Sequence, residues 1–461
     1  MPTIQKNNSN NITLTGYTSG QNMTASISQE NILAAFDDYG SERHNWLIGG
    51  EYERIIVQKN GLPISYDQTH GIRWFLEQFQ KRWNWNPIKE NDNLIALHKD
   101  GASITLEPGG QFELSGRPHK TLETLSLEFE HNRNCIKALT NEANLTTITC
   151  GLTPIAPINS IHWMPKGRYD IMKAYLPQKG DRALFMMKGT ASVQCNYDFE
   201  HEADCAKKVQ LCSGLAPLTT ALFANSPLYQ NKPTGYMSYR GEIWTRTDPD
   251  RTGFPPGLRN DYTHKRWVNY LLDVPMMFIK RSKWIHAHGR SFRSFINDGI
   301  EGHFPTWSDW DLHMTSVFPE VRIKKTIEVR GADCVPHDLA LSFCALFTAL
   351  LYDNEALDRG LELCAQFTAL QNRQERFHLA CKEGLRGKLK DSSGTGHPLS
   401  WWAEQLLDIA QGGLERIEPK NKHLLLPLIK QVATGGSPAE QLLAQWHEDS
   451  TPSTIVAFSQ Y

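Results

Sequence analysis

The feature that most constrains the fold is a set of strand-like segments whose polar side chains recur at every second position. Three of them, residues 46–58, 190–200 and 321–331, are rich in β-branched and aromatic residues. Because successive side chains of a strand point to opposite faces, the polar residues within each segment share one face. These residues are Glu51 and Glu53; Gln194, Asn196 and Asp198; and Lys324, Thr326, Glu328 and Arg330. The sequence therefore predicts a sheet with one strongly polar face.

A fourth segment, LEPGGQFELSG, places Glu107 and Glu113 on either side of a Pro-Gly-Gly turn. The two carboxylates share a face if the connection is five residues long, Pro108 to Phe112, whereas a two-residue turn would put them on opposite faces. The sequence leaves this register open.

Each strand taken alone fits a sheet whose polar face lies in water. Glutamate recurs here, however, beside the glycine pairs 49–50 and 109–110, which allow a ligand to approach the backbone closely. Five glutamates on one face would repel one another unless cations neutralised them, and ligation by oxygen alone indicates Mg²⁺ or Mn²⁺. This pattern suggests a nucleotide-phosphate site.

Arg330 follows Glu328 by two residues and would lie beside such metals as a phosphate clamp. The alternative is that Arg330 only pairs with Glu328 or Asp333 and stiffens the end of the strand.

The rest of the chain adds helices to this sheet. Apolar spacing predicts helices after Ser28 and over 68–83, 119–142 and 203–215, and from residue 336 onward over 337–352, 354–372, 399–412, 421–433 and 437–447. We expect one α+β protein, with a flexible tail at 1–25, a catalytic body at 26–335 and a C-terminal helical layer at 336–461 packed on it. A long irregular stretch, 226–257, is typical of a loop that serves a site.

The charge balance, the N-terminal segment and the cysteines indicate which partners and which cell compartment to expect. The 48 Lys and Arg balance 50 Asp and Glu without a run of like charge, which favours small molecules over nucleic acid or a membrane surface. The first 25 residues resemble neither a signal nor a transit peptide, so we predict a cytoplasmic protein. The nine cysteines lack metal-ligand spacing and are expected to be mostly buried.

Common nucleotide and hydrolase motifs do not occur: the chain has no G-x-x-x-x-G-K-[ST], G-x-G-x-x-G, H-E-x-x-H or G-x-S-x-G. A phosphate would therefore be held by metals and side chains.

A series of short segments resembles the motifs of plant-type and proteobacterial glutamate–cysteine ligases. Between about residues 46 and 335 they follow that family's order: IGGEYE, LEPGGQFELSG, GRYDIMKAYLP, SVQCNYDFE, LFANSPL, GYMSYRGEIWTRTDPDRTG, LDVPMMF, FPEVR and EVRGAD. The resemblance implies a glutamine-synthetase-like fold, in which a curved antiparallel sheet forms a funnel that holds Mg²⁺ and ATP. It also implies an enzyme that phosphorylates the γ-carboxylate of L-glutamate and joins it to the amine of L-cysteine, as a monomer or homodimer.

The resemblance assigns roles to individual residues. It implies that two or three Mg²⁺ ions are bound by Glu51, Glu53, Glu107, Glu113, Asn196 and Glu328. It implies catalytic roles for Arg330 and Arg251, and substrate pockets shaped by Gln194, Thr190, Met187, Arg240 and Trp244.

Departures from the family pattern lie near the substrate side. This chain has Gly189-Thr190-Ala191-Ser192 where the family usually has Arg-Thr-Cys-Thr, and Cys334-Val335-Pro336-His337 where Gly-Gly-Pro-Trp is usual. Two alternatives therefore stay open: a γ-glutamyl ligase with another amine acceptor, and a protein that binds metal or nucleotide without catalysis.

Overall fold

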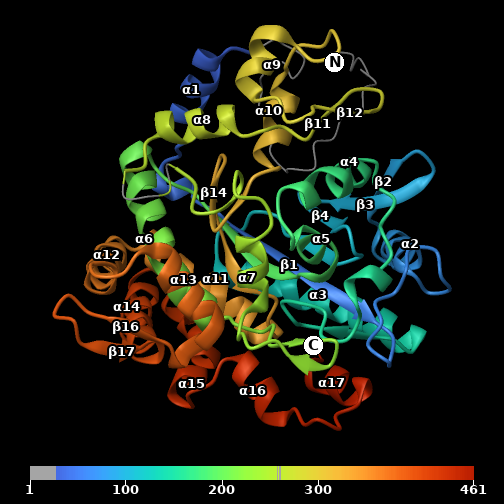
Figure 1. The fold of residues 1–461 in the computed structure, drawn as a ribbon. Helices are drawn as coiled ribbons and strands as arrows, with labels where there is room; N and C mark the ends of the chain where they lie inside the picture. Colours follow the sequence, from blue (N-terminus) through green and yellow to red (C-terminus); the bar gives the residue numbers. More distant parts are fainter. Residues whose placement is uncertain (1–26, 257, 259–260, 461) are drawn as a thin grey trace, which may run out of the picture.

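One antiparallel sheet of nine strands forms the centre of the computed structural model, which describes residues 27–256, 258 and 261–460 (Figure 1). Eight strands lie in the order β14-β15-β7-β1-β5-β4-β3-β2, and β6 pairs with the end of β1. Their bounds are β1 Ile48–Val57, β2 Asn86–Glu90, β3 Asn93–Lys99, β4 Ala102–Leu106, β5 Phe112–Ser115, β6 Thr146–Ile148, β7 Ser192–Tyr197, β14 Val321–Ile323 and β15 Ile327–Asp333. The predicted tail at 1–25 lies outside the described residues.

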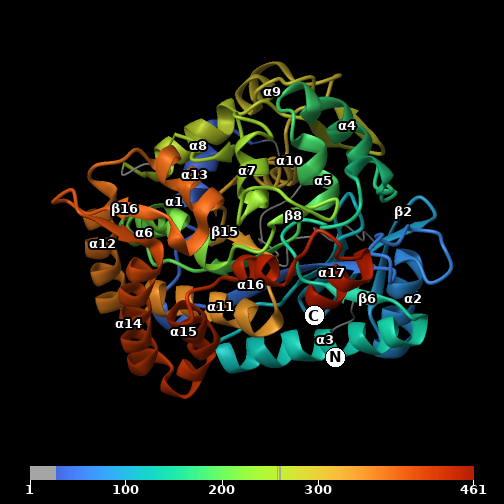
Figure 2. The same cartoon turned by 60° about the horizontal axis from the view of Figure 1, so that its bottom comes forward.

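The two faces of the sheet differ as the alternation predicts. Tyr52 of β1 is fully buried and stacks on Phe129 of helix α3 (Leu122–Ala143), with ring centroids 5.6 Å apart. Its neighbours Glu51 and Glu53 point to the other face and line a cavity. The helices α3, at the lower edge of Figure 2, and α11 (His337–Tyr352) both contact β1. The polar face is therefore the side on which a ligand can bind.

Helices dominate the chain after residue 336. They are α11, α12 (Asn354–Thr368), α13 (Arg373–Glu383), α14 (Leu399–Ile417), α15 (Leu426–Ala433), α16 (Pro438–Gln445) and α17 (Pro452–Phe458). The prediction of a helical C-terminal region is confirmed, and the bounds of α11 agree with it to the residue. It missed α13, α17 and the hairpin of β16 (Lys388–Lys390) and β17 (Gly396–Pro398), because short or polar segments carry little periodicity.

A group of short elements lies together at one end of the molecule, at the top of Figure 1. It contains α1 (Gln29–Asp37), α8 (His264–Asp273), β11 (Phe278–Lys280), β12 (Trp284–His286), α9 (Phe292–Asp298) and α10 (Trp307–Met314). Ser28 caps α1, as predicted, by accepting a hydrogen bond from the backbone of Asn31. Parts of β11, β12 and α10 face the cavity.

The stretch 226–257 contains more structure than its composition suggests. After α6 (Glu202–Leu222) it holds β8 (Leu228–Tyr229), β9 (Lys232–Pro233), α7 (Tyr239–Thr245) and β10 (Thr252–Gly253). Two further helices, α4 (Arg168–Tyr175) and α5 (Ala183–Gly189), precede β7, and α2 (Ile72–Trp83) packs against β3. The helix α7 carries two of the candidate substrate residues.

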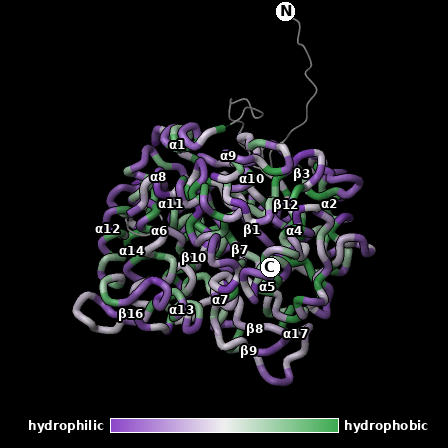
Figure 3. Tube along the Cα trace, turned by 45° about the horizontal axis from the view of Figure 1, so that its top comes forward, coloured by the Kyte–Doolittle hydropathy of each residue, from purple (hydrophilic) through white to green (hydrophobic). Residues whose placement is uncertain are grey.

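The main apolar core is continuous from the sheet into the C-terminal helices. One buried cluster joins Tyr52 and Val329 of the sheet to Phe343 of α11 and Leu406 of α14. In Figure 3 the hydrophobic, green segments lie mostly in the interior, and the hydrophilic, purple ones lie mostly along the outer helices. The division at residues 335 and 336 stays a prediction.

Candidate active site

A cavity of about 640 Å³ lies on the polar face of the sheet. Its floor consists of side chains from β1, β4, β5 and β7, and its walls come from α4, α7, α10, β11, β12 and the turn between β14 and β15. Strands distant in sequence therefore bring their polar residues to one enclosed space. A cavity of this size can hold a ligand of small-molecule dimensions.

Strand pairing places the carboxylates of the floor next to one another. Glu53 of β1 lies directly opposite Glu113 of β5, and Glu113 lies opposite Thr105 of β4. Glu51 lies opposite Gln194 of β7. The register that the sequence left open is resolved: Glu107 lines the same cavity as Glu113.

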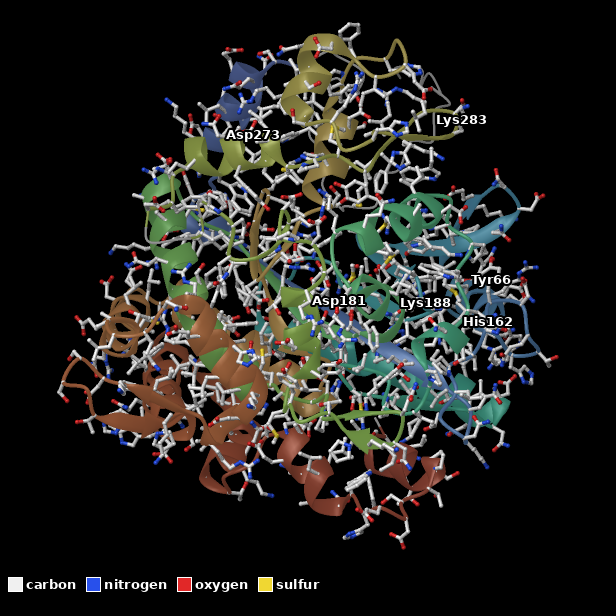
Figure 4. All side chains as sticks on the ribbon, viewed as in Figure 1. Tyr66, His162, Asp181, Lys188, Asp273 and Lys283 are labelled. Atoms are coloured by element: carbon white, nitrogen blue, oxygen red, sulfur yellow. The ribbon has the colours of Figure 1, made fainter. Side chains whose placement is uncertain are left out.

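The connection around Glu107 is held by a glutamine. The backbone N–H of Glu107 donates to the carbonyl of Gln111, the side chain of Gln111 accepts from Gly109 N–H at 3.0 Å, and it donates to the carbonyl of Thr190 at 2.7 Å. A Cβ at Gly109 would overlap the carbonyl of Lys188, which Figure 4 labels in α5. Glycine therefore lets this turn pack against α5 and hold Glu107 at the cavity.

The buried carboxylates of the floor repel one another. Burial, and then the carboxylates of Glu328 and Glu113, raise the pKa of Glu51 to about 7. Burial, and then Glu113 and Glu107, raise the pKa of Glu53, and burial and Glu107 raise that of Glu113. Such crowding is typical of a site that binds cations.

Glu328 is surrounded differently. It is fully buried, and both of its oxygens accept hydrogen bonds of 2.8 Å from Arg322, while Lys324 lies at 3.1 Å and Arg330 also contacts it. Burial opposes the ionisation of Glu328, but these three cations outweigh it and hold its pKa well below the ordinary value. The cations line the cavity and Glu328 lies behind them.

Arg330 pairs with Glu328, as one of the two alternatives from the sequence required, and it also lines the cavity, as the other required. Its Nη1 contacts Glu328 and the side-chain oxygen of Gln194, and its guanidinium group belongs to the cavity wall. Gln194 in turn lies 3.4 Å from Glu53. Arg330 is thus tied to the floor while it faces a ligand.

Most of the predicted substrate residues also line the cavity. Arg240 and Trp244 come from α7, Thr190 from the residues before β7, and Gln194 from β7 itself, which also carries the predicted metal ligand Asn196. Met186 lines the cavity, whereas Met187 does not and is buried in the apolar core. The prediction for Met187 is corrected to its neighbour, because the helical turn of α5 directs the two side chains differently.

Arg251 lies away from the cavity, which corrects its predicted catalytic role. It is fully buried and pairs with Asp248 at 2.6 Å, and it donates to the carbonyls of Pro275 at 2.7 Å and Ser316 at 3.1 Å. These contacts hold the 248–252 loop against the segments around Pro275 and Ser316. Its role in the structure is to support the wall.

Sequence reasoning missed several cationic and aromatic residues of the walls: Lys166, Arg168, Tyr169, Trp284, Arg322 and Lys325. Lys166 and Tyr169 both donate to the carbonyl of Leu106, at 2.7 and 2.5 Å, next to Glu107. The segments GRYDIMKAYLP and FPEVR contain some of these residues, but only the fold shows that they face the carboxylates.

The carboxylates of the floor do not form a closed metal site in this structure. Among them no three His, Cys, Asp or Glu side chains lie close enough together to hold a metal ion as they stand. All nine cysteines are buried and free, as expected. No helix in the described part of the chain has the length and apolar character needed to cross a membrane.

Comparison with known families gives one match that covers most of the chain. Residues 47–455 match the family described as Glutamate-cysteine ligase family 2 (GCS2). The chain is 37% identical over 443 residues to the chloroplastic glutamate–cysteine ligase of Brassica juncea, covering 95% of this chain and 84% of the relative. It is 39% identical over 411 residues to that of Medicago truncatula, covering 88% and 79%.

Solved structures support the fold. A glutamate–cysteine ligase from Francisella tularensis in complex with AMP superposes with a TM-score of 0.54 at 14% identity, over 91% of this chain and 89% of that one. A bifunctional glutathione synthetase from Pasteurella multocida gives 0.53 at 12% identity, over 94% and 53%. The predicted glutamine-synthetase-like α+β fold is confirmed.

The prediction of a cytoplasmic protein is wrong by this comparison. The finding that overturns it is that the curated relatives are named as chloroplastic enzymes.

Proposed function

The chain belongs to glutamate–cysteine ligase family 2, and from this membership we infer that it is an ATP-dependent ligase that makes γ-glutamylcysteine. It joins the γ-carboxyl group of L-glutamate to the amine of L-cysteine through a γ-glutamyl phosphate and releases ADP and phosphate, the first step of glutathione biosynthesis. The observation that carries this proposal is the match over residues 47–455, together with relatives that cover nearly the whole chain. The cavity supplies the chemistry on which the rest of the proposal depends.

Mg²⁺ fits the chemistry of the floor. Four glutamates line one cavity, and burial and neighbouring carboxylates raise the pKa of Glu51, Glu53 and Glu113. Their carboxylate oxygens are the kind of ligand that Mg²⁺ prefers. Bound there, Mg²⁺ would neutralise the triphosphate and stabilise charge on the transferring phosphoryl group.

The proposed ligands form two groups. Glu53 lies opposite Glu113, and Glu107 raises the pKa of both, so these three would serve one ion after their side chains move closer together than they are in this structure. Asn196 donates to Glu51 at 2.8 Å and lies opposite Glu328 in the sheet, so these three would serve another. Glu328 already has three cationic partners and would share its oxygens with them. Two groups favour two ions.

The chain's own cations would position the negative groups of the substrates. Arg330, Arg322 and Lys324 stand together in one wall and match the charge of transferring phosphate. Arg240, in the neighbouring α7, matches a substrate carboxylate. The walls exclude water from the acyl phosphate, which favours attack by the amine over hydrolysis.

The amine must reach the acyl phosphate as a free base, and phosphate must leave with its charge held. The guanidinium group of Arg330 is suited to the second task, because it donates from a fixed plane and cannot lose its proton at neutral pH. Its contact with Glu328 and Gln194 fixes that plane before the substrates bind. Arg330 is therefore the residue we propose as catalytic.

Mass spectrometry of purified protein with ATP, Mg²⁺, L-glutamate and L-cysteine tests the function. We expect γ-glutamylcysteine, ADP and phosphate in equal amounts. AMP and pyrophosphate would overturn the acyl-phosphate route. In a competition among cysteine, 2-aminobutyrate and glycine, preference for another amine would indicate a different γ-glutamyl ligase. Binding of ATP by calorimetry without turnover of any amine would indicate a protein that only binds its ligands.

A further inference from the structure

A buried carboxylate outside the cavity joins the strand that carries Arg330 to the helix that carries Arg240. Asp333 is the last residue of β15 and lies opposite Ser192 of β7, and its side chain is 1% exposed. Its Oδ2 accepts from Asn225 N–H at 2.8 Å and from the hydroxyl of Ser226 at 2.7 Å. Its Oδ1 accepts from the hydroxyl of Ser238 at 2.8 Å.

Two of these donors, Ser238 and Ser226, also bind backbone N–H groups in the first turn of α7. Ser238 is the N-cap of this helix, and its hydroxyl accepts from Gly241 N–H at 3.1 Å. Ser226 comes from the segment after α6, and its hydroxyl accepts from Arg240 N–H at 2.9 Å. Asp333 therefore holds the start of α7 through two serines, one at the N-cap of the helix and one in the segment after α6.

The positions of the two α7 residues that line the cavity depend on these hydrogen bonds. Arg240 and Trp244 are one helical turn apart and both line the cavity. Arg240 donates from Nη2 to the carbonyl of Arg330 at 3.1 Å, and its Nη1 lies 3.9 Å from Asp333. A small rotation of α7 would move both side chains relative to Arg330.

The residues around Asp333 leave space for its side chain and fix its hydrogen-bond donors. A Cβ at Gly151 would overlap the side chain of Asp333, so only glycine leaves the space that Asp333 fills. The side-chain amide of Asn225 donates to the carbonyls of Thr149 and Cys334, which holds the segment that supplies two of the three donors. Burial raises the pKa of Asp333, and the nearby guanidinium group of Arg240 and three hydrogen bonds oppose this effect.

We propose that Asp333 is a positioning residue that sets Arg240 and Trp244 for binding of L-glutamate. This inference rests on the proposed function. L-Glutamate is the amino-acid substrate with two carboxylates, and the guanidinium group of Arg240, held beside Arg330 by its bond to the Arg330 carbonyl, matches one of them. Asp333 touches neither the cavity nor a substrate and acts only through α7.

Calorimetric titration of L-glutamate in the presence of Mg²⁺ and ADP, where no turnover occurs, tests the positioning role. The variants are Asp333→Asn, Arg240→Lys and the double variant. Asp333→Asn keeps the shape but loses the charge and one acceptor, so we expect about a 10-fold rise in the dissociation constant, as for other residues that orient a binding group. Arg240→Lys should give a similar rise. The double variant should bind no more than about twofold more weakly than Arg240→Lys, because both changes disturb one group.

A matched control separates positioning from stability. Asp353 is also a buried carboxylate with three hydrogen bonds, from Ala356 N–H at 2.8 Å and from Arg416 at 3.0 and 2.6 Å, but it lies in the C-terminal layer. Asp353→Asn should lower the unfolding temperature and leave glutamate binding within about twofold of the wild type. Ser226→Ala provides a milder version of the test, with about a threefold loss of affinity expected from one hydrogen bond.

The outcomes are distinguishable. Glutamate affinity within twofold of the wild type in Asp333→Asn and Ser226→Ala, with a lowered unfolding temperature, would overturn the positioning role. Multiplying losses in the double variant would overturn it too, because they would show independent action. A wild type that binds glutamate but forms no dipeptide would overturn the proposed function alone, and one that binds no glutamate would overturn both.

Discussion

Replacing Arg330 by lysine tests whether the geometry of the guanidinium group, beyond its charge, supports phosphoryl transfer. In the structure one nitrogen, Nη1, contacts Glu328 and Gln194, which leaves the rest of the planar group to the cavity wall. Lysine keeps a positive charge near Glu328 but offers a single ammonium group in place of the fork. The variant therefore removes donors without removing the charge.

The expected cost follows from the number of donors lost. Removal of one preorganised donor to a developing negative charge costs about 3 kcal/mol, which corresponds to about a 100-fold fall in kcat. The fold should survive, because Glu328 keeps its two 2.8 Å bonds to Arg322 and its contact with Lys324. The Michaelis constants for glutamate and cysteine should change by less than about threefold, since the donors act on the transferring phosphoryl group.

Steady-state kinetics with all three substrates varied, with the unfolding temperature measured in parallel, provide the assay. Arg359→Lys is the control, because Arg359 pairs with Glu355 at 3.7 Å on the exposed surface of α12, and this variant should behave like the wild type. Turnover of Arg330→Lys within threefold of the wild type would refute the reasoning. So would a defect that disappears on cooling, because Arg330 would then belong to the scaffold alone.

Three further changes test other parts of the site. Glu113→Gln should weaken Mg²⁺ binding and lower turnover by about 100-fold while the protein stays folded, as measured by Mg²⁺ titration; unchanged Mg²⁺ dependence would show that the carboxylate is only structural. Arg251→Lys should lower the free energy of unfolding by about 2 kcal/mol, because the variant loses hydrogen bonds to two carbonyls. Turnover per folded molecule should stay within twofold of the wild type. A loss of turnover without a loss of stability would restore the catalytic role of Arg251. Burial lowers the pKa of His313 to about 4. Between about pH 6.5 and 4 the folded protein therefore binds fewer protons than the unfolded chain. The free energy of unfolding has its full value above this pH range and falls by up to about 3 kcal/mol as the pH drops through it. In urea unfolding at pH 7 and pH 4.5, His313→Gln should show a smaller pH dependence than the wild type, and an equal dependence would contradict this account.

The sequence by itself determined the composition of the polar face. Period-two spacing is a local property of a strand, so it placed Glu51 with Glu53, and Glu328 with Arg330, without any knowledge of the neighbours. It also set the helical character of the C-terminal region, because apolar spacing over 337–352 is fixed by the helix that forms there. The family resemblance rested on the same short segments.

Tertiary structure decided everything that depends on contacts between distant segments. The pairing of β4 with β5 put Glu107 and Glu113 on one face, a question of register that local spacing left open. The packing of α5 turned Met186 toward the cavity and Met187 away from it, and the burial of Arg251 gave it a structural role. Lys166 reaches the floor from a segment some sixty residues away along the chain, through its bond to Leu106. Such placements come from the burial of apolar surface across the whole core, which favours one arrangement of segments that no single segment specifies.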